Sequence, residues 1–185
     1  MNALAKAQSY LHYTSSSRKG LIEQLEYEGF DRKSAEFGAD NSGADWNEQA
    51  VLKAQSYIRY SSFSTSSLIE QLEYEGFTHD QAVYGVGHID MDQNDQALSK
   101  AKSYLNYTAF SYKGLVEQLE YEGFSHDEAV NAANNCGADW NEQAAKKAES
   151  YLKYTSFSRS GLIEQLEYEG FTRKQAEYGV KKVGF

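Results

Sequence analysis

Three glutamates are the residues of this chain whose type and spacing could most readily support acid–base chemistry. Glu70, Glu73 and Glu75 lie within one short segment, and equivalent glutamates recur three more times along the chain. Two carboxylates act as general acid and base only when a cleft holds them and separates their pKa values. At helical spacing these glutamates fall on a polar face, and no partner motif accompanies them. We therefore interpret them as a solvated helix face and predict that the protein is not an enzyme.

The histidines and the single cysteine do not form a metal-binding or nucleophilic motif. His79 and His126 occupy equivalent positions, each followed by an aspartate. A metal site needs several ligands at suitable spacing, and the sequence contains no Cys/His cluster and no HExxH. Cys136 has no evident base, and no GxSxG motif occurs. We predict surface histidines, no catalytic residue, no metal site and no cofactor.

A strict internal repeat positions all of these residues. The heptapeptide QLEYEGF begins at Gln24, Gln71, Gln118 and Gln165, so the spacing is 47 residues each time. Periods of this length are typical of stacked supersecondary units. The predicted repeats, one to four, cover residues 1–44, 45–91, 92–138 and 139–185. Met1 is in register with Glu48, so we expect repeat one to be truncated and the chain to be a fragment of a longer precursor.

A second period of 94 residues indicates that the repeats are paired two and two. The sequence GADW ends at Trp46 and again at Trp140, whereas the middle junction reads differently. We predict that repeat one pairs with repeat two and repeat three with repeat four. Large aromatic side chains are costly to leave exposed. The two tryptophans are therefore expected to fill the seam within each pair.

Each repeat is predicted to contain three helices. In repeat two, Asp45 caps a first helix that ends near Tyr60, Ser64 caps the second, and Thr78 caps the short third one. Gly76 ends the second helix, as glycine commonly does after a C-cap. The fold class is therefore all-α, with a helix-turn-helix character in every repeat.

Apolar spacing indicates how the three helices of a repeat pack. Leu68, Ile69 and Leu72 follow helical spacing and form the core face of the second helix of repeat two. Small residues, including Ala82 and Gly85, line one face of the third helix. We expect this small face to let helix three lie close on helix two.

The net charge of −9 is the wrong sign for a typical nucleic-acid-binding protein. Repeats one to four carry −1, −5, −4 and +1, so the negative charge is concentrated in the middle. Such a field steers a basic partner, although solubility alone accounts for it equally well. The candidate partner-binding residues are the acidic residues of repeats two and three with two tyrosines: Glu70, Glu73, Tyr74, Glu75, Asp80, Asp90, Asp92, Asp95, Glu117, Glu120, Tyr121, Glu122, Asp127 and Glu128.

Tyrosine is unusually frequent, with 15 residues. Tyr74 and its equivalents Tyr27, Tyr121 and Tyr168 point away from the core leucines on a helical wheel. We interpret them as contacts between repeats. The alternative is an aromatic contact surface flanked by glutamates, because tyrosine combines a large apolar ring with a polar tip.

A DNA-binding helix-turn-helix protein places its second helix in the major groove and holds phosphates with basic residues. Repeats one and four offer basic residues at the start of the third helix, and repeats two and three offer histidine and aspartate there. The basic residues are Arg32, Lys33, Arg173 and Lys174, and the others are His79, Asp80, His126 and Asp127. Acidic copies in the middle would repel DNA. We predict no nucleic-acid partner, and a DNA-binding regulator is the least favoured alternative.

Residues 100–124 read KAKSYLNYTAFSYKGLVEQLEYEGF, and both the SYLxY and the QLEYEGF motif have parallels in the other repeats. This pattern resembles the Ltp family of host-cell-surface-exposed lipoproteins, which occurs in Gram-positive bacteria and their temperate phages. The resemblance covers essentially the whole chain.

The resemblance implies a surface location and a role in phage resistance. Members are anchored outside the cytoplasmic membrane by an N-terminal lipid-modified cysteine, and phage-encoded members act in superinfection exclusion by blocking DNA injection. The implied partner is a basic segment of a phage tail protein such as the tape measure protein. The sequence shows no lipoprotein signal, and Cys136 lies in a repeat junction. We therefore expect the lipid anchor to belong to the precursor. We also expect the chain to be a monomer. The alternative is a bacterial cell-surface interaction module unrelated to phage.

Overall fold

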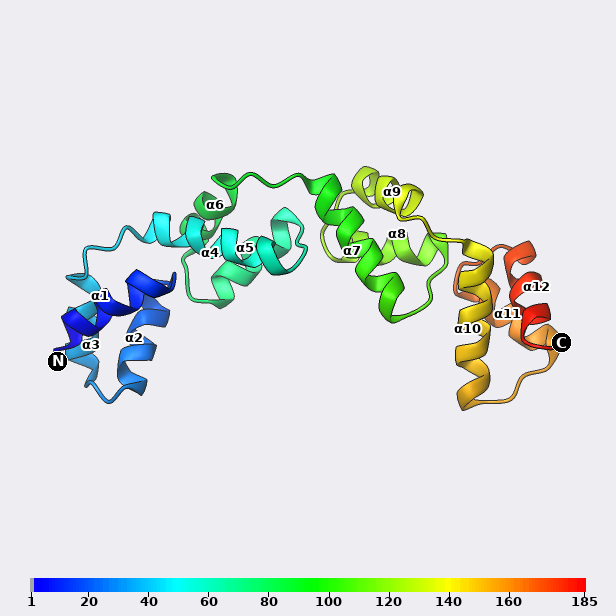
Figure 1. The fold of residues 1–185 in the computed structure, drawn as a ribbon, viewed down its shortest axis with the longest axis horizontal. Coiled ribbons are helices and arrows are strands. Elements are labelled where there is room, and N and C mark those ends of the chain that lie inside the picture. Colours follow the sequence, from blue (N-terminus) through cyan, green and yellow to red (C-terminus); the bar gives the residue numbers. More distant parts are fainter. Residues whose placement is uncertain (1) are drawn as a thin grey trace. The chain divides into compact units, whose positions relative to one another are not determined.

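A computed structural model describes residues 2–185 and shows an all-α protein (Figure 1). Twelve helices and no strands occur in this range, three helices to each repeat, which confirms the predicted fold class. Met1, on which the register of the truncated first repeat depends, lies outside the described residues. The helices are α1 (Ala3–Tyr13), α2 (Arg18–Tyr27), α3 (Arg32–Asp40), α4 (Trp46–Tyr60), α5 (Thr65–Tyr74), α6 (His79–Gly87), α7 (Gln93–Tyr107), α8 (Tyr112–Tyr121), α9 (His126–Asn135), α10 (Trp140–Tyr154), α11 (Arg159–Tyr168) and α12 (Arg173–Lys182).

The helix starts lie at the predicted capping residues. The side chain of Asp45 accepts hydrogen bonds from the first N–H groups of α4, and Ser64 and Thr78 form reciprocal capping boxes at α5 and α6. These caps bind N–H groups that have no acceptor within the helix, and each stabilises its helix by about 1 kcal/mol. Local sequence therefore determines where the helices begin.

The turn after each second helix is a Schellman motif centred on glycine. In repeat two, Gly76 has φ +88° and donates to the carbonyl of Glu73, while the N–H of Phe77 donates to the carbonyl of Leu72. A side chain disfavours this left-handed conformation, so glycine is required. The motif turns Phe77 inward, where it is buried in the core of the same repeat.

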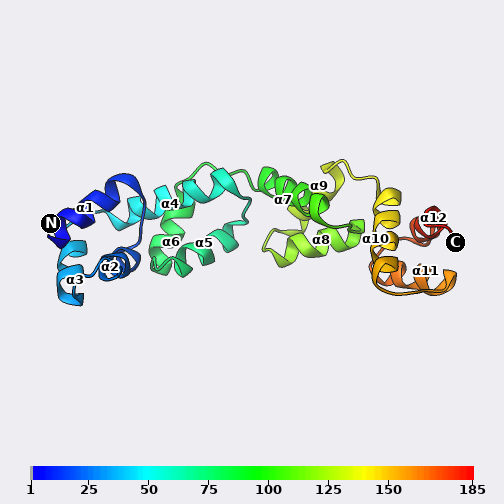
Figure 2. The same ribbon diagram turned by 60° about the horizontal axis from the view of Figure 1, so that its bottom comes forward.

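Each repeat has its own hydrophobic core. In repeat two, the alanines of α4, the leucines of α5 and Ala82 of α6 are completely buried, and Phe77 and Val86 complete the cluster. Equivalent clusters occupy the other three repeats. The three helices of a repeat lie together in both views of the ribbon (Figure 2).

The third helix contacts helix two, as predicted, but the glycine of its small face makes its closest approach to helix one. A Cβ atom on Gly85 would lie 2.8 Å from the carbonyl carbon of Ala50 in α4. The same approach occurs between Gly179 and Ala144, at 2.7 Å. The short alanines of helix one expose its backbone, so the closest packing in the repeat is between helices one and three.

The chain divides into two compact units, unit 1 (Met1–Met91) and unit 2 (Asp92–Phe185), which matches the predicted pairing. In unit 1, the hydroxyl of Ser17 donates to the carbonyl of Glu75 at 2.6 Å and so ties the start of α2 to the turn of repeat two. Ser17 is also the N-cap of α2, and it is almost completely buried. Trp46 packs against the core of repeat one, as predicted for the seam.

Unit 2 repeats this seam 94 residues later. The hydroxyl of Ser111 donates to the carbonyl of Glu169 at 2.6 Å. Trp140 packs against the core of repeat three and makes an edge-to-face contact with Tyr112, with ring centroids 5.5 Å apart. A cap serine that also binds the neighbouring turn therefore defines each seam.

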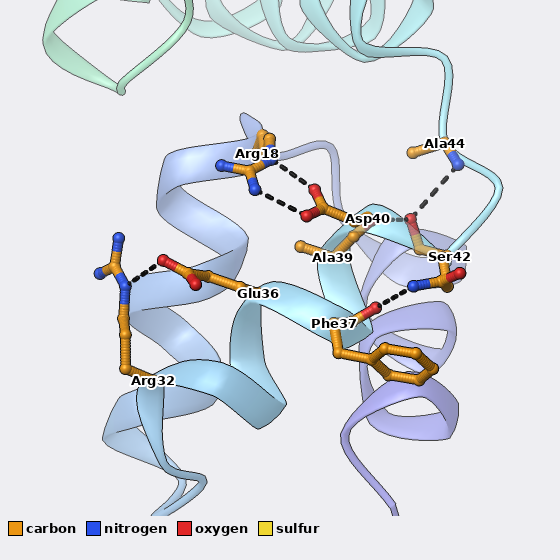
Figure 3. A network of polar contacts seen from close by, with 9 residues as sticks. Arg18, Arg32, Glu36, Phe37, Ala39, Asp40, Ser42 and Ala44 are labelled. Carbon is orange, nitrogen blue, oxygen red and sulfur yellow. Dashed lines mark hydrogen bonds and ion pairs between the residues drawn. The ribbon is translucent and has the colours of Figure 1, made fainter.

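Repeat one contains an additional polar link between helices two and three (Figure 3). The guanidinium of Arg18 donates to both carboxylate oxygens of Asp40, at 2.6 and 2.8 Å, and these bonds hold the pKa of Asp40 below its usual range. In repeat three, Tyr112 donates to Asn134 at the equivalent positions. The link is thus kept with different chemistry.

Candidate interaction surface

A cluster of four polar residues recurs in every repeat and was not predicted from the sequence. In repeat two, Tyr57 donates a hydrogen bond to Glu75 and accepts one from Gln71 at 3.2 Å. The ammonium of Lys53 lies 3.0 Å from the same carboxylate and 5.5 Å from the centroid of the Tyr57 ring. The signal was present in the sequence as a lysine, a tyrosine four residues later and a glutamate eighteen residues after that, at the same register in all four repeats.

The cluster shifts the pKa of two of its members. Burial raises the pKa of Tyr57 to about 12, with a further contribution from its hydrogen bond to Glu75. Burial also acts to raise the pKa of Glu75, but the hydrogen bonds from Tyr57 and Lys53 outweigh it, and the pKa is lowered. The cluster therefore holds a protonated tyrosine and an ionised glutamate together, and it links helix one to the end of helix two.

This cluster corrects the interpretation of the glutamates as one solvated face. Glu75 and Glu122 are half-buried, and the ammonium groups of Lys53 and Lys100 lie 3.0 Å from their carboxylates. These two candidate residues hold the repeat together and have little capacity left for a partner.

The glutamate two positions earlier binds the start of the third helix. Glu73 lies 2.7 Å from His79, and Glu120 lies 2.6 Å from His126. In repeat one, Arg32 occupies the histidine position and pairs with two glutamates of its own repeat. Arg173 does the same in repeat four. The two arginines considered for phosphate binding are therefore paired with carboxylates of their own repeats.

Several candidate aspartates serve helix starts. Asp92 is the N-cap of α7, and Asp95 lies in the first turn of the same helix. Asp80 and Asp127 lie in the first turns of α6 and α9, and Glu128 completes the capping box of α9. Carboxylates at these positions stabilise the helix by a few tenths of a kcal/mol up to about 1 kcal/mol. The four aspartates remain exposed and Glu128 is half-buried, so this structural use does not exclude contact of the aspartates with a partner.

The remaining candidate carboxylates are the most available. Glu70 is exposed and has no ion-pair partner within residues 2–185, and Asp90 is exposed in the segment that precedes α7. Glu117 is exposed and lies 3.6 Å from the ammonium of Lys113. Glu70 and Asp90 belong to unit 1 and Glu117 to unit 2, so these three candidates are divided between the units. Their role in binding stays a prediction.

The tyrosines at the ends of the second helices are exposed, so the prediction that they pack between repeats was wrong. Tyr74 is 86% exposed, and its equivalents are 87–88% exposed. We call these four the helix-two tyrosines, and they are Tyr27, Tyr74, Tyr121 and Tyr168. A second set that the sequence analysis missed lies at the ends of the first helices, with 81–88% of each side chain exposed. We call these the helix-one tyrosines, and they are Tyr13, Tyr60, Tyr107 and Tyr154.

An open groove lies at the seam of unit 2. Its volume is about 460 Å³, within the range of ligand-binding clefts. Tyr121 of repeat three and Tyr168 of repeat four both line it, together with Phe110, Glu117 and Gln118. The groove thus contains two candidate residues, Glu117 and Tyr121, and joins them to a tyrosine of the next repeat. We call it the tyrosine groove.

Among residues 2–185, no three histidine, cysteine, aspartate or glutamate side chains gather in a way that could hold a metal ion. Cys136 is the C-cap of α9 and is half-buried, with its thiol 3.3 Å from the carbonyl of Ala133. None of the described helices is both long enough and apolar enough to cross a membrane.

The fold and this surface define a tandem array of small helical repeats of the kind used for binding. The sequence profile of host cell surface-exposed lipoproteins, Lipoprotein_Ltp, matches residues 1–41, 45–89, 92–135 and 139–183. The chain belongs to this family, as its motifs predicted. The family is one of surface-exposed lipoproteins and is not known as an enzyme family. Each matched segment falls within one predicted repeat.

A solved structure is also similar to part of the chain. It is described as the structure of Ltp, a superinfection exclusion protein from the Streptococcus thermophilus temperate phage TP-J34. The sequences are 33% identical over 50% of this chain and 97% of that one, with a TM-score of 0.47. No curated protein sequence matches the chain significantly.

Proposed function

We propose that the chain is the ectodomain of a lipid-anchored surface lipoprotein that acts in superinfection exclusion. It would bind a phage tail component outside the cytoplasmic membrane and stop the entry of phage DNA. The observation that carries the proposal is the family match, which recurs in all four repeats and leaves only short junctions unmatched. The proposed partner is a basic segment of a tail protein such as the tape measure protein.

The proposed mechanism is obstruction, with no bond made or broken. The net charge of −9 favours encounter with a positively charged segment. The exposed carboxylates of Glu70, Asp90 and Glu117 would then contact its lysines and arginines. DNA itself is a poor candidate, because Arg32 and Arg173 are paired with glutamates of their own repeats.

An anchor in the precursor would strengthen this mechanism. A tail component that reaches the membrane would meet the repeats at a high effective concentration, so a modest affinity for each site would suffice. The same chain released into the medium would lack this advantage. The comparison between anchored and released protein therefore separates obstruction at the membrane from simple titration of phage.

The test is to express the chain behind a lipoprotein signal and its cysteine on the surface of a susceptible host. The expected result is normal adsorption of phage together with a loss of DNA entry and of plaques, for at least one phage. The matched control is the same chain secreted without the cysteine, which should protect much less. Normal DNA entry for every phage tried would overturn the proposal.

A further inference from the structure

We propose that the tyrosine groove of unit 2, and the equivalent position in unit 1, is the docking site for an extended basic peptide segment. The partner's arginine or lysine side chains would lie against the rings of the helix-two tyrosines. This inference deepens the proposed function, on which its choice of a basic protein segment rests. It assigns the contact to particular residues at the seams between paired repeats.

The groove is built on the rigid part of the seam. The hydroxyl of Ser111 binds the carbonyl of Glu169 at 2.6 Å, which fixes the turn of repeat four against the start of α8. Gly170 lies so close that a Cβ atom there would be 2.9 Å from the same hydroxyl. Phe110, at one edge, packs edge-to-face on Tyr104 with centroids 5.6 Å apart. The backbone frame of this surface is therefore fixed before a ligand binds.

The two tyrosines of the groove have no structural role that explains their exposure. Tyr121 and Tyr168 are each 87% exposed, and neither makes a hydrogen bond or ring contact with another described residue. Exposed tyrosines that recur at one register are typical of contact surfaces, where they supply most of the binding energy. Their rings also attract the cationic groups of arginine and lysine.

Charge selects a basic occupant. Glu117 lines the groove, and Glu164 is exposed on the adjoining helix α11 without an ion-pair partner in the described part of the chain. Lys113 also lines the groove, but its ammonium lies 3.6 Å from the carboxylate of Glu117. The pair neutralises both of its members, so the unpaired charge beside the groove is that of Glu164, one helical turn before Tyr168. A cation over the ring of Tyr168 would be stabilised by the ring and by the carboxylate of Glu164, because residues four apart are neighbours on a helix.

Unit 1 has the same seam contacts, with Ser16 at the position of Phe110. Ser17 binds the carbonyl of Glu75 at 2.6 Å, and Gly76 lies against Ser17 and Lys19 as Gly170 lies against Ser111 and Lys113. Tyr27 and Tyr74 end the corresponding helices and are 88% and 86% exposed. The inference therefore assigns one docking site to each pair of repeats.

The experiment compares two sets of four substitutions in the full chain. One variant replaces all four helix-two tyrosines by serine, and the matched control replaces all four helix-one tyrosines, which are equally exposed. A third variant replaces the helix-two tyrosines by phenylalanine. The probe is a short fluorescent peptide in which arginine alternates with glycine, measured by polarisation, and an aspartate–glycine peptide and a neutral chitin oligosaccharide are measured beside it. Helical content and melting temperature establish that each variant is folded.

The expected result is binding of the arginine peptide alone, weakened at least about tenfold by the helix-two serine variant. The helix-one variant and the phenylalanine variant should stay within about twofold of the unsubstituted chain, since the ring and not the hydroxyl carries the contact. Equal loss in the two serine variants would overturn the inference. Binding of the oligosaccharide in place of the arginine peptide would overturn it as well.

The same variants separate this inference from the proposed function. If the anchored chain excludes phage and the helix-two serine variant excludes equally well, the docking site is refuted and the function stands. If the peptide binds as expected but the anchored chain excludes no phage, the function is refuted and the docking site stands.

Discussion

Replacing Gly76 by alanine tests whether the seam of unit 1 holds as described, because Gly29 provides an internal control. Both residues end a second helix with positive φ, at +88° and +92°. An added Cβ atom at Gly29 meets nothing within 4 Å, whereas at Gly76 it would lie 2.9 Å from the Ser17 hydroxyl and 3.0 Å from the Lys19 Cβ. The two alanine variants therefore share a backbone strain of about 1–2 kcal/mol and differ in the seam.

The difference between the two variants can be worked out from the contact. Alanine at position 76 displaces Ser17 from its 2.6 Å hydrogen bond to Glu75, and a net loss of about 1 kcal/mol follows. Steric strain at Lys19 adds to this. We expect Gly76→Ala to lower the free energy of unfolding by about 1–2 kcal/mol more than Gly29→Ala, or roughly 4–8 °C in melting temperature per kcal/mol for a unit of this size.

The assay is scanning calorimetry of the full chain, combined with amide hydrogen exchange read by mass spectrometry. Amide exchange shows whether the loss of stability lies in unit 1, and the protection of amides in unit 2 serves as the reference in the same sample. Gly76→Ala should raise exchange in α2 and α5 together, because the seam joins them. Equal losses in the two variants would refute the reasoning, since they would mean that only backbone strain matters.

Three further predictions also concern substitutions of single residues. Ser111→Ala should lower the free energy of unfolding by about 1 kcal/mol more than Ser158→Ala, measured by urea titration. Both serines cap a helix, but only Ser111 also binds the neighbouring repeat. Equal effects would contradict the described seam. Gly87→Ala should stabilise α6 by about 0.5–1 kcal/mol, because the added Cβ atom meets nothing within 4 Å. Gly85→Ala should destabilise repeat two, because the added Cβ atom would lie 2.8 Å from the α4 backbone. Melting curves distinguish the two signs. Tyr57 has a folded pKa of about 12 against about 10 when unfolded, so its contribution is complete below pH 10 and is lost as pH rises toward 12. The difference in unfolding free energy between the wild type and Tyr57→Phe should fall over that interval, and a flat difference would exclude the linkage.

Features determined by a few neighbouring residues were predictable from the sequence. Ser64 and Thr78 begin helices because their side chains bind N–H groups three residues away, and Gly76 ends one because glycine adopts its positive φ without strain. The strict spacing of the repeats then extended each of these predictions to the whole chain. The seam tryptophans were found because the 94-residue period places Trp46 and Trp140 at the junctions of the pairs.

Features that depend on packing between helices were missed. Glu75 looked solvated because its partners Lys53 and Tyr57 lie on another helix, and a helical wheel of one segment does not contain them. Gly85 was assigned to the wrong neighbour for the same reason, since spacing shows that a face is small but not which helix covers it. For Tyr74, the helical wheel correctly placed the side chain away from the core. The assumption that another repeat must then cover the ring was wrong.

The seam has a consequence for how such arrays can lengthen or shorten over time. Ser111 and Lys113 at the start of α8 meet the turn at Gly170, and the next repeat carries Ser160 in place of that lysine. A duplication or deletion of 94 residues leaves every donor half of a seam beside its acceptor half. Such a change also conserves the alternation of Lys19, Ser66, Lys113 and Ser160 at the start of the second helices, whereas a change of 47 residues would place two equal residues in succession.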